Sequence, residues 1–174
     1  RTRLARLHES LAALSLEQPK AAPPPALREQ LLAGLDSRAA VPYPGFARRL
    51  QRLYQLDEQQ TLEILRKSAD PAQWEDQGFI SLLHFAAGES LPGTHAGFMR
   101  LQPGLRFPRH RHVGHEHMLM LAGTLQDEDS GVLYHPGDLL VMEPGSEHAF
   151  TVLAPHAGVF AILLHESWPL FTGN

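Results

Sequence analysis

Leucine spacing and a proline run set the pattern at the start of the chain. Leucines recur every three or four residues over 3–16, which indicates the apolar stripe of an amphipathic helix. Three consecutive prolines at 23–25 break this pattern, because proline lacks an amide donor and favours extended geometry. Segment 26–35 predicts a second, short helix.

Two further helices are predicted before the next break. Residues 46–56 follow a helical period, and Asp57 is a suitable N-cap for a helix that continues to about residue 69. Asp70-Pro71 ends it, since the residue before a proline disfavours helical geometry. We therefore expect residues 1–70 to form a helical extension with a proline-rich linker.

The pattern changes after Pro71. Segments of five to eight residues rich in Phe, Ile, Leu and Val alternate with turn residues at roughly ten-residue spacing, which is typical of a β-sandwich or barrel. We therefore expect residues 75–168 to form a mainly β domain. The segments are GFISLLHF, HAGFMRLQPG, EHMLMLAG, GVLYHPGDLLVMEPG, HAFTVLAP and GVFAILLH.

Composition narrows the classes of protein. The 174 residues carry a net charge of −4 and no long apolar run, so we expect neither a nucleic-acid surface nor a membrane span. Cysteine is absent, which excludes disulfides, thiolate catalysis and cysteine-based zinc sites and fits a cytoplasmic protein. Because the sequence starts with Arg1 rather than Met, we expect it to be a fragment or a trimmed product.

Histidine is concentrated in the segment FPRHRHVGHEHMLMLAG, residues 107–123. In a strand, residues two apart share a face, so His110 and His112 point the same way and Glu116 can join them from the next strand. His148, which follows EPGSE, is the natural fourth ligand. We therefore predict a metal site formed by His110, His112, Glu116 and His148.

The other histidines are assigned differently. His115 and His117 alternate with Glu116, so they should face away from the metal and have a structural or surface role. Met118 and Met120 share the face of Glu116 and should line the pocket or fill the barrel. Six further histidines belong to no metal-site pattern: His8, His84, His95, His135, His156 and His165.

Three imidazoles and one carboxylate suit several metals. They can close a tetrahedral zinc site, or leave open positions on iron, manganese, nickel or copper. The side chains expected around the ligands are apolar, with Phe150 and Phe98 beside the two methionines, and only Tyr134 and Arg106 could add polar groups. This environment favours a structural or sensory metal over hydrolysis or isomerisation, but an oxygenase needs few polar side chains.

These residues resemble the two motifs of the cupin superfamily. Gly104, His110, His112, Glu116 and Gly123 match the first motif at every position. The second motif runs from Gly137-Asp138 through Gly145 to His148, with Glu143 in the usual proline position and Val152 replacing a frequent asparagine. The resemblance covers residues 78–166 and implies a double-stranded β-helix, or jelly-roll, barrel with these four metal ligands.

The run from His110 to His148 is more closely similar to the cupin-like domain of ChrR-type anti-sigma factors, including the acidic residues 127–129. The resemblance implies zinc bound by the four predicted ligands and a part in oxidative-stress responses. In that family a separate N-terminal zinc domain holds the sigma factor.

The N-terminal segment is similar to the region that follows the sigma-binding domain in anti-sigma factors. However, the His-x3-Cys-x2-Cys motif of that domain is missing because the sequence has no cysteine. Either the domain lies upstream of Arg1, or this is a free-standing relative. The expected partner is an ECF-type sigma factor, held through a region upstream or through the N-terminal helices, and a homodimer is also compatible with the fold.

The sequence is compatible with three functions. The first is a metal-bound, zinc-containing regulatory module acting in a transcriptional stress response. The second is a small metal-dependent cupin dioxygenase or related oxidoreductase, because many such enzymes share this ligand set. The third, a sugar-binding or storage cupin, rests on the fold alone.

Overall fold

The structure is a computed structural model that describes residues 41–166 and 170–171. The helices predicted over 3–16 and 26–35, and the proline run between them, lie outside the described residues. No helix in the described ranges is long and apolar enough to cross a membrane.

The helices predicted over 46–56 and from Asp57 to about residue 69 are confirmed. A 3-10 turn, η1 (Pro44–Phe46), leads into α3 (Ala47–Tyr54), and α4 (Glu58–Ala69) follows. Asp57 forms a capping box with Gln60, in which each side chain bonds the other residue's backbone N–H. A second 3-10 turn, η2 (Pro71–Gln73), connects the helices to the strands.

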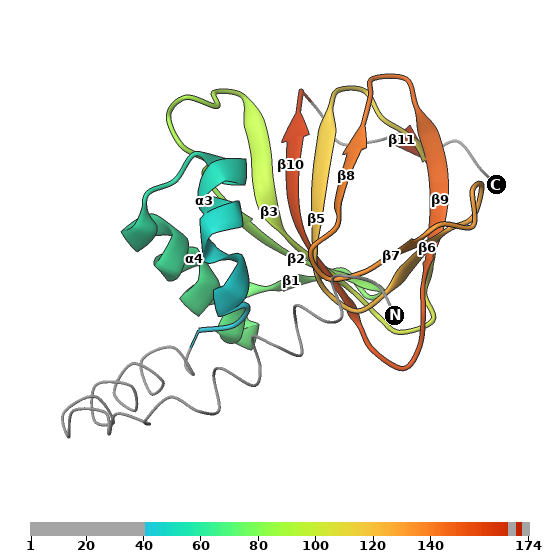
Figure 1. The fold of residues 1–174 in the computed structure, drawn as a ribbon, viewed down its shortest axis with the longest axis horizontal. Coiled ribbons are helices and arrows are strands. Elements are labelled where there is room, and N and C mark those ends of the chain that lie inside the picture. The colour runs from blue at the N-terminus through green and yellow to red at the C-terminus, as the bar shows by residue number, and fades with distance from the viewer. Residues whose placement is uncertain (1–40, 167–169, 172–174) are drawn as a thin grey trace, which may run out of the picture. The chain divides into compact units, whose positions relative to one another are not determined.

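The rest of the described chain forms two antiparallel sheets, which confirms the predicted mainly β fold. The six-stranded sheet contains, in spatial order, β1 (Glu75–Asp76), β2 (Ile80–Phe85), β3 (Thr94–Leu101), β10 (Gly158–His165), β5 (Glu116–Ala122) and β8 (Leu139–Met142). The five-stranded sheet contains β11 (Leu170–Phe171), β4 (Arg106–Arg111), β9 (Glu147–Val152), β6 (Leu125–Asp127) and β7 (Leu133–Tyr134). Figure 1 shows the two sheets facing each other around a common interior.

That interior holds one of two hydrophobic clusters. Its buried side chains alternate along the strands with outward-facing ones, as strand geometry requires. The cluster consists of Leu82, Met99, Leu101, Phe107, Met118, Met120, Leu125, Leu140, Phe150, Val152, Phe160 and Ile162.

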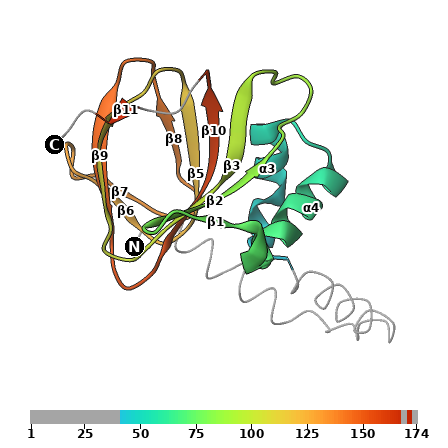
Figure 2. The ribbon, with the colours of Figure 1, turned by 180° about the vertical axis from the view of Figure 1, so that it is seen from behind.

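The second cluster lies on the outer face of the six-stranded sheet. Helices α3 and α4 cover this face beside β2, β3 and β10 (Figures 1 and 2). Tyr54 of α3 is fully buried there, and its hydroxyl donates to the Gly97 carbonyl at 2.8 Å. Phe98, expected near the metal ligands, packs in this outer cluster instead, because strand alternation directs its neighbour Met99 inward. Helices α3 and α4 therefore pack directly on the β domain.

Candidate metal centre

Three of the predicted ligands meet between the sheets. His110 on β4 pairs in register with His148 on β9, and His112 follows the end of β4. A nitrogen of each imidazole lies within 4.8 Å of a nitrogen of the other two. All three residues are at most 4% exposed, so water competes little for these nitrogens.

A β-bulge in β4 helps to position the first histidine. The register with β9 shifts between Phe107 and His110, so these residues, three apart, both face the interior. Phe107 stacks on Phe150 with ring centroids 4.9 Å apart and an interplanar angle of 3°. This aromatic pair forms an apolar wall beside the histidines.

His112 is held by its own backbone. Its N–H donates to the Ser146 carbonyl at 3.0 Å, and its carbonyl accepts from the Gly145 N–H at 2.7 Å. The turn before β9 therefore fixes the loop that carries His112, although that residue lies beyond β4 itself.

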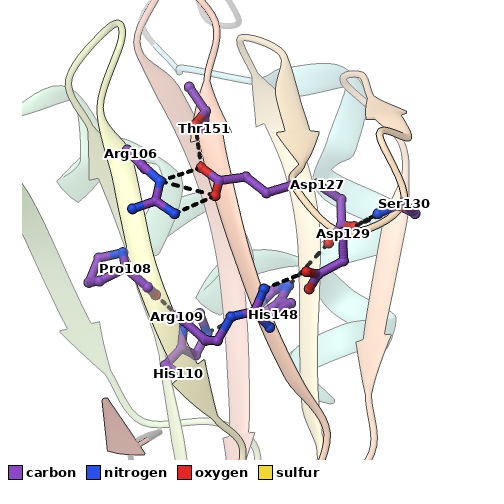
Figure 3. A network of polar contacts seen from close by, with 10 residues as sticks. Arg106, Pro108, Arg109, His110, Asp127, Asp129, Ser130, His148 and Thr151 are labelled. Atoms are coloured by element: carbon purple, nitrogen blue, oxygen red, sulfur yellow. Dashed lines mark hydrogen bonds and ion pairs between the residues drawn. The ribbon is translucent and has the colours of Figure 1, made fainter. Parts of the chain in front are cut away.

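Two of the three imidazoles have a hydrogen-bond acceptor at Nδ1, whereas Nδ1 of His148 has none among the described residues. Nδ1 of His110 donates to the Pro108 carbonyl at 2.9 Å, and Nδ1 of His112 lies 2.9 Å from Oε2 of Glu116. Nδ1 of His148 lies 3.8 Å from Oδ2 of Asp127 (Figure 3). With their protons on Nδ1, the neutral rings of His110 and His112 present the Nε2 lone pair, which is the arrangement typical of metal-binding histidines.

The three Nε2 atoms suit a cation. Nε2 of His110 and Nε2 of His148 face each other at 2.9 Å, and two bare lone pairs at this distance repel unless a proton or a metal ion lies between them. Nε2 of His112 is buried and has no hydrogen-bond partner among the described residues. The donor set therefore fits a divalent transition metal that accepts imidazole ligands.

Burial favours the neutral form of the His110 and His148 rings. It lowers the pKa of His110, and it lowers the pKa of His148 from 6.5 to about 3, with the neighbouring His110 and His112 adding to the shift. A proton is thus a weak competitor for these nitrogens near neutral pH.

Glu116 lies on the opposite sheet from His110 and His148. It starts β5, is 7% exposed, and lines the same cavity as those two histidines. Its Oε2 atom contacts His112 Nδ1, as given above, so the carboxylate orients this imidazole in the described geometry. It is not one of the three residues whose ligand atoms converge.

Asp127 was missed by sequence reasoning. In the sequence it belongs to the acidic run 127–129, yet it is 8% exposed and faces His148 from the end of β6. Ser130 donates to its Oδ1 from both the backbone N–H (2.7 Å) and the hydroxyl (2.6 Å) (Figure 3). Burial raises the pKa of Asp127, but the hydrogen bonds from Ser130 outweigh it, so the pKa lies below its usual value. The available signal was its two-residue spacing from the buried Leu125.

Arg106 and Tyr134, the two polar residues that the sequence suggested near the ligands, do not line the cavity. Arg106 points outward and forms a bidentate pair with Glu128, which also accepts from the Thr151 hydroxyl (Figure 3). Arg109 pairs with Asp129 on the same surface. Tyr134 packs against the interior hydrophobic cluster.

A cavity of about 400 Å³ adjoins the histidines. Its walls are mainly apolar, with Phe79, Ile80, Met99, Met118, Phe150 and Leu164 among them. Met118 lines it as predicted, whereas Met120 is buried in the interior cluster without lining the cavity. Phe79 is 46% exposed and lies just before β2, so this side of the cavity reaches the surface. A small apolar molecule could therefore approach the histidines.

His115 and His117 lie on the other side of β5. His117 lines a separate surface hollow with Leu119 and Leu163, two members of the outer cluster. Nδ1 of His115 lies 3.2 Å from Oε2 of Glu143 at an exposed position. Strand alternation thus separates both residues from the three converging histidines, as predicted.

Solved structures support the predicted barrel. A chain in the structure of Rhodobacter sphaeroides SigE in complex with the anti-sigma ChrR aligns with a TM-score of 0.52 and 16% identity, covering 92% of this chain and 77% of that chain. An RmlC-like cupin protein from Ralstonia eutropha aligns with a TM-score of 0.51 and 14% identity, covering 58% and 67%. At these identities the likeness shows the fold, which is that of a cupin. No curated protein matches the sequence.

The family is given by the sequence match. The model of the ChrR cupin-like domain matches residues 79–168, a range that contains the three converging histidines, Glu116 and Asp127. This range is more than half of the 174 residues. The chain therefore belongs to the ChrR cupin-like domain family.

Proposed function

We propose that this protein is the metal-binding sensor module of a ChrR-type anti-sigma regulator that acts in the cytoplasm in a transcriptional stress response. The observation that carries the proposal is the convergence of three buried imidazoles, with an acceptor at Nδ1 of His110 and of His112 and the Asp127 carboxylate 3.8 Å from Nδ1 of His148. Such a set holds a metal firmly and leaves few polar groups for general acid or base chemistry.

The proposed ion is zinc, held by His110, His112, His148 and Glu116. Three nitrogen ligands and one oxygen ligand complete a tetrahedral site, the geometry that zinc prefers. For Glu116 to be the fourth ligand, its carboxylate would turn from His112 Nδ1 toward the three Nε2 atoms. Iron, manganese and nickel accept the same donors, so metal analysis has to decide among them.

The cavity supports a sensory role. Its apolar walls would admit a small, weakly polar molecule and exclude bulk water from the ligands. A molecule that reached the site could displace or modify a ligand and change the packing of β4, β5 and β9, which all carry site residues. Because α3 and α4 pack on the sheet that contains β5, such a change could reach the helices.

The proposed partner is an ECF-type sigma factor. Family membership and the fold shared with a chain of the SigE–ChrR complex support this partner. Contact would involve a region upstream of Arg1 or the N-terminal helices, because the cysteine-containing sigma-binding motif is absent from the sequence.

Metal content of purified, tag-free variants tests the ligands directly. His112→Ala and His148→Ala should lose the tightly bound metal found in the wild type, and Glu116→Gln should bind it more weakly. His156→Ala, at an exposed position, is the matched control and should keep it. Equal metal content in all four variants would refute the ligand assignment.

A pull-down tests the regulatory role separately. The full-length gene product should retain an ECF-type sigma factor from its own organism and release it when the metal is removed or the stress signal is applied. Retention that ignores both treatments would contradict a sensory function while leaving the metal site intact.

The apolar cavity beside the ligands favours one alternative, a small cupin dioxygenase. Iron-loaded protein would then consume oxygen with small diketones, thiols or phenols. No oxygen uptake with any of these substrate classes would exclude it.

A further inference from the structure

A second group of histidines crosses the outer face of the six-stranded sheet. His115 immediately precedes β5, His117 is its second residue, and His165 ends the neighbouring strand β10. Glu143 follows β8, the neighbour of β5 on the other side. These four side chains belong to three adjacent strands, and none of them has a role in the site between the sheets.

The backbone holds this group in register. The His165 N–H donates to the His115 carbonyl at 2.9 Å, which extends the β5–β10 ladder by one step. A Cβ atom on Gly114 would lie only 1.9 Å from the His165 carbonyl oxygen, so the close approach of these segments requires glycine. His115 and His165 are therefore fixed opposite each other.

The side chains already interact. Nδ1 of His115 lies 3.2 Å from Oε2 of Glu143, and the ring of His165 lies 6.4 Å from that of His115 and 5.8 Å from that of His117. Nδ1 of His117 is buried and has no hydrogen-bond partner among the described residues. An imidazole nitrogen that has lost water without gaining a partner is unfavourable, and a cation would relieve this.

We propose that His115, His117, His165 and Glu143 form a second site for a divalent transition-metal ion such as Zn²⁺ or Cu²⁺, on the reverse side of the strand that carries Glu116. Imidazole and carboxylate are the ligands that these ions take from proteins without cysteine. The second site lies on the outer face of the six-stranded sheet, whereas the first lies between the sheets.

The second site should bind more weakly than the first. Its ring centroids are 5.8 and 6.4 Å apart, against 4.5 to 5.1 Å among His110, His112 and His148. The side chains must therefore rotate to meet a common ion. His115 and Glu143 are 50% and 70% exposed, so this rotation meets little steric resistance.

Two arginines oppose a cation here. Arg49 and Arg52 line the same surface hollow as His117 and His165. Arg49 donates to the Gly137 carbonyl and Arg52 to the Arg48 carbonyl, so hydrogen bonds direct both guanidinium groups to backbone oxygens. Their positive charge lowers the affinity of the second site for a metal ion. In a titration, the second site should therefore fill after the first.

Calorimetric titration of the full, tag-free chain with Zn²⁺ tests the proposal. The wild type should bind two equivalents, and His165→Ala and Glu143→Gln should each weaken the second by at least about tenfold while the first is unchanged. In a His112→Ala background the first equivalent should disappear and the weaker one should remain.

Controls separate this site from adventitious binding. His8→Ala and His156→Ala should each leave both equivalents intact. Glu143→Gln changes a 70% exposed side chain, so lost binding in this variant cannot be attributed to unfolding, and circular dichroism would verify this. A wild type that binds one equivalent, or a second equivalent unaffected by His165→Ala and Glu143→Gln, would overturn the proposal.

Discussion

One histidine group lies between the sheets and the other on the outer face of the six-stranded sheet, and the two groups differ in exposure and in the contacts of their ring nitrogens. Between the sheets, three residues at most 4% exposed bring ring nitrogens within 4.8 Å of one another, and Nδ1 of His110 and Nδ1 of His112 each have an acceptor. On the outer face, His115 is half exposed and contacts a flexible carboxylate. Histidine supplies three side chains in both groups, so burial and the orientation of the rings distinguish a tight site from a loose one.

The largest expected difference between the groups is in stability. Chelating the proposed inner zinc should lower the free energy of unfolding by about 4 kcal/mol when free zinc had been a thousandfold above its Kd. That corresponds to roughly 10 °C in Tm for a domain of this size. Thermal unfolding with and without a chelator measures the change.

One variant from each histidine group serves as a control for this experiment, and the two variants should respond differently to the chelator. His112→Ala should start at the lower Tm and no longer respond to chelator, whereas His165→Ala should respond as the wild type does. A wild-type response in His112→Ala would place the stabilising ion elsewhere.

The metal-free protein should lose stability in mild acid. Burial lowers the pKa of His110 and brings that of His148 to about 3, so the unfolded chain takes up these protons first as the pH falls below 6.5. The free energy of unfolding should therefore decrease from pH 6.5 toward pH 5, before carboxylates titrate. Urea unfolding of chelated protein across this range tests the sign.

Replacing one of these histidines should flatten that pH dependence. His148→Gln removes a titrating group from the interior, so its stability should vary less between pH 6.5 and 5. A wild-type slope in His148→Gln would mean that burial does not suppress protonation of His148.

Much of the inner site could be predicted from the sequence. Two-residue alternation selected His110, His112 and Glu116 and excluded His115 and His117, because the pleat of a strand decides which face a side chain takes. Alternation failed where the backbone departs from it: the bulge in β4 brings Phe107 and His110 to the same side.

Other features depended on contacts between distant segments. Asp127 sits in an acidic run that is typical of a solvated loop, and only the fold places it against His148, 21 positions further along the chain. The cavity is built from six strands, and its volume depends on how the sheets pack. The helices could be predicted from their caps, but the burial of Tyr54 against Gly97 could not.

Asp127 allows the inner site to be weakened without removing a ligand. Asp127→Asn keeps the shape of the side chain but replaces the carboxylate that lies 3.8 Å from Nδ1 of His148 by a neutral amide, so zinc affinity should fall about 10- to 100-fold. Competition with a chromophoric chelator measures this. Asp129→Asn, whose side chain is 49% exposed and pairs with Arg109, should change the affinity less than about twofold. An equal loss in both variants would indicate a general effect of the acidic loop rather than orientation of His148.

The smallest effect is expected on the outer face. His117→Leu replaces a ring with an unpartnered, buried Nδ1 by an apolar side chain of similar size, next to Leu119 and Leu163. Removing a polar atom that has no hydrogen bond should leave the free energy of unfolding unchanged or raise it by up to about 1 kcal/mol. Metal bound between the sheets should stay at the wild-type level, because Glu116 and His117 project from opposite faces of β5. Loss of that metal in His117→Leu would show that the two faces of the strand are coupled, and the comparison between a tight inner site and an independent outer one would then fail.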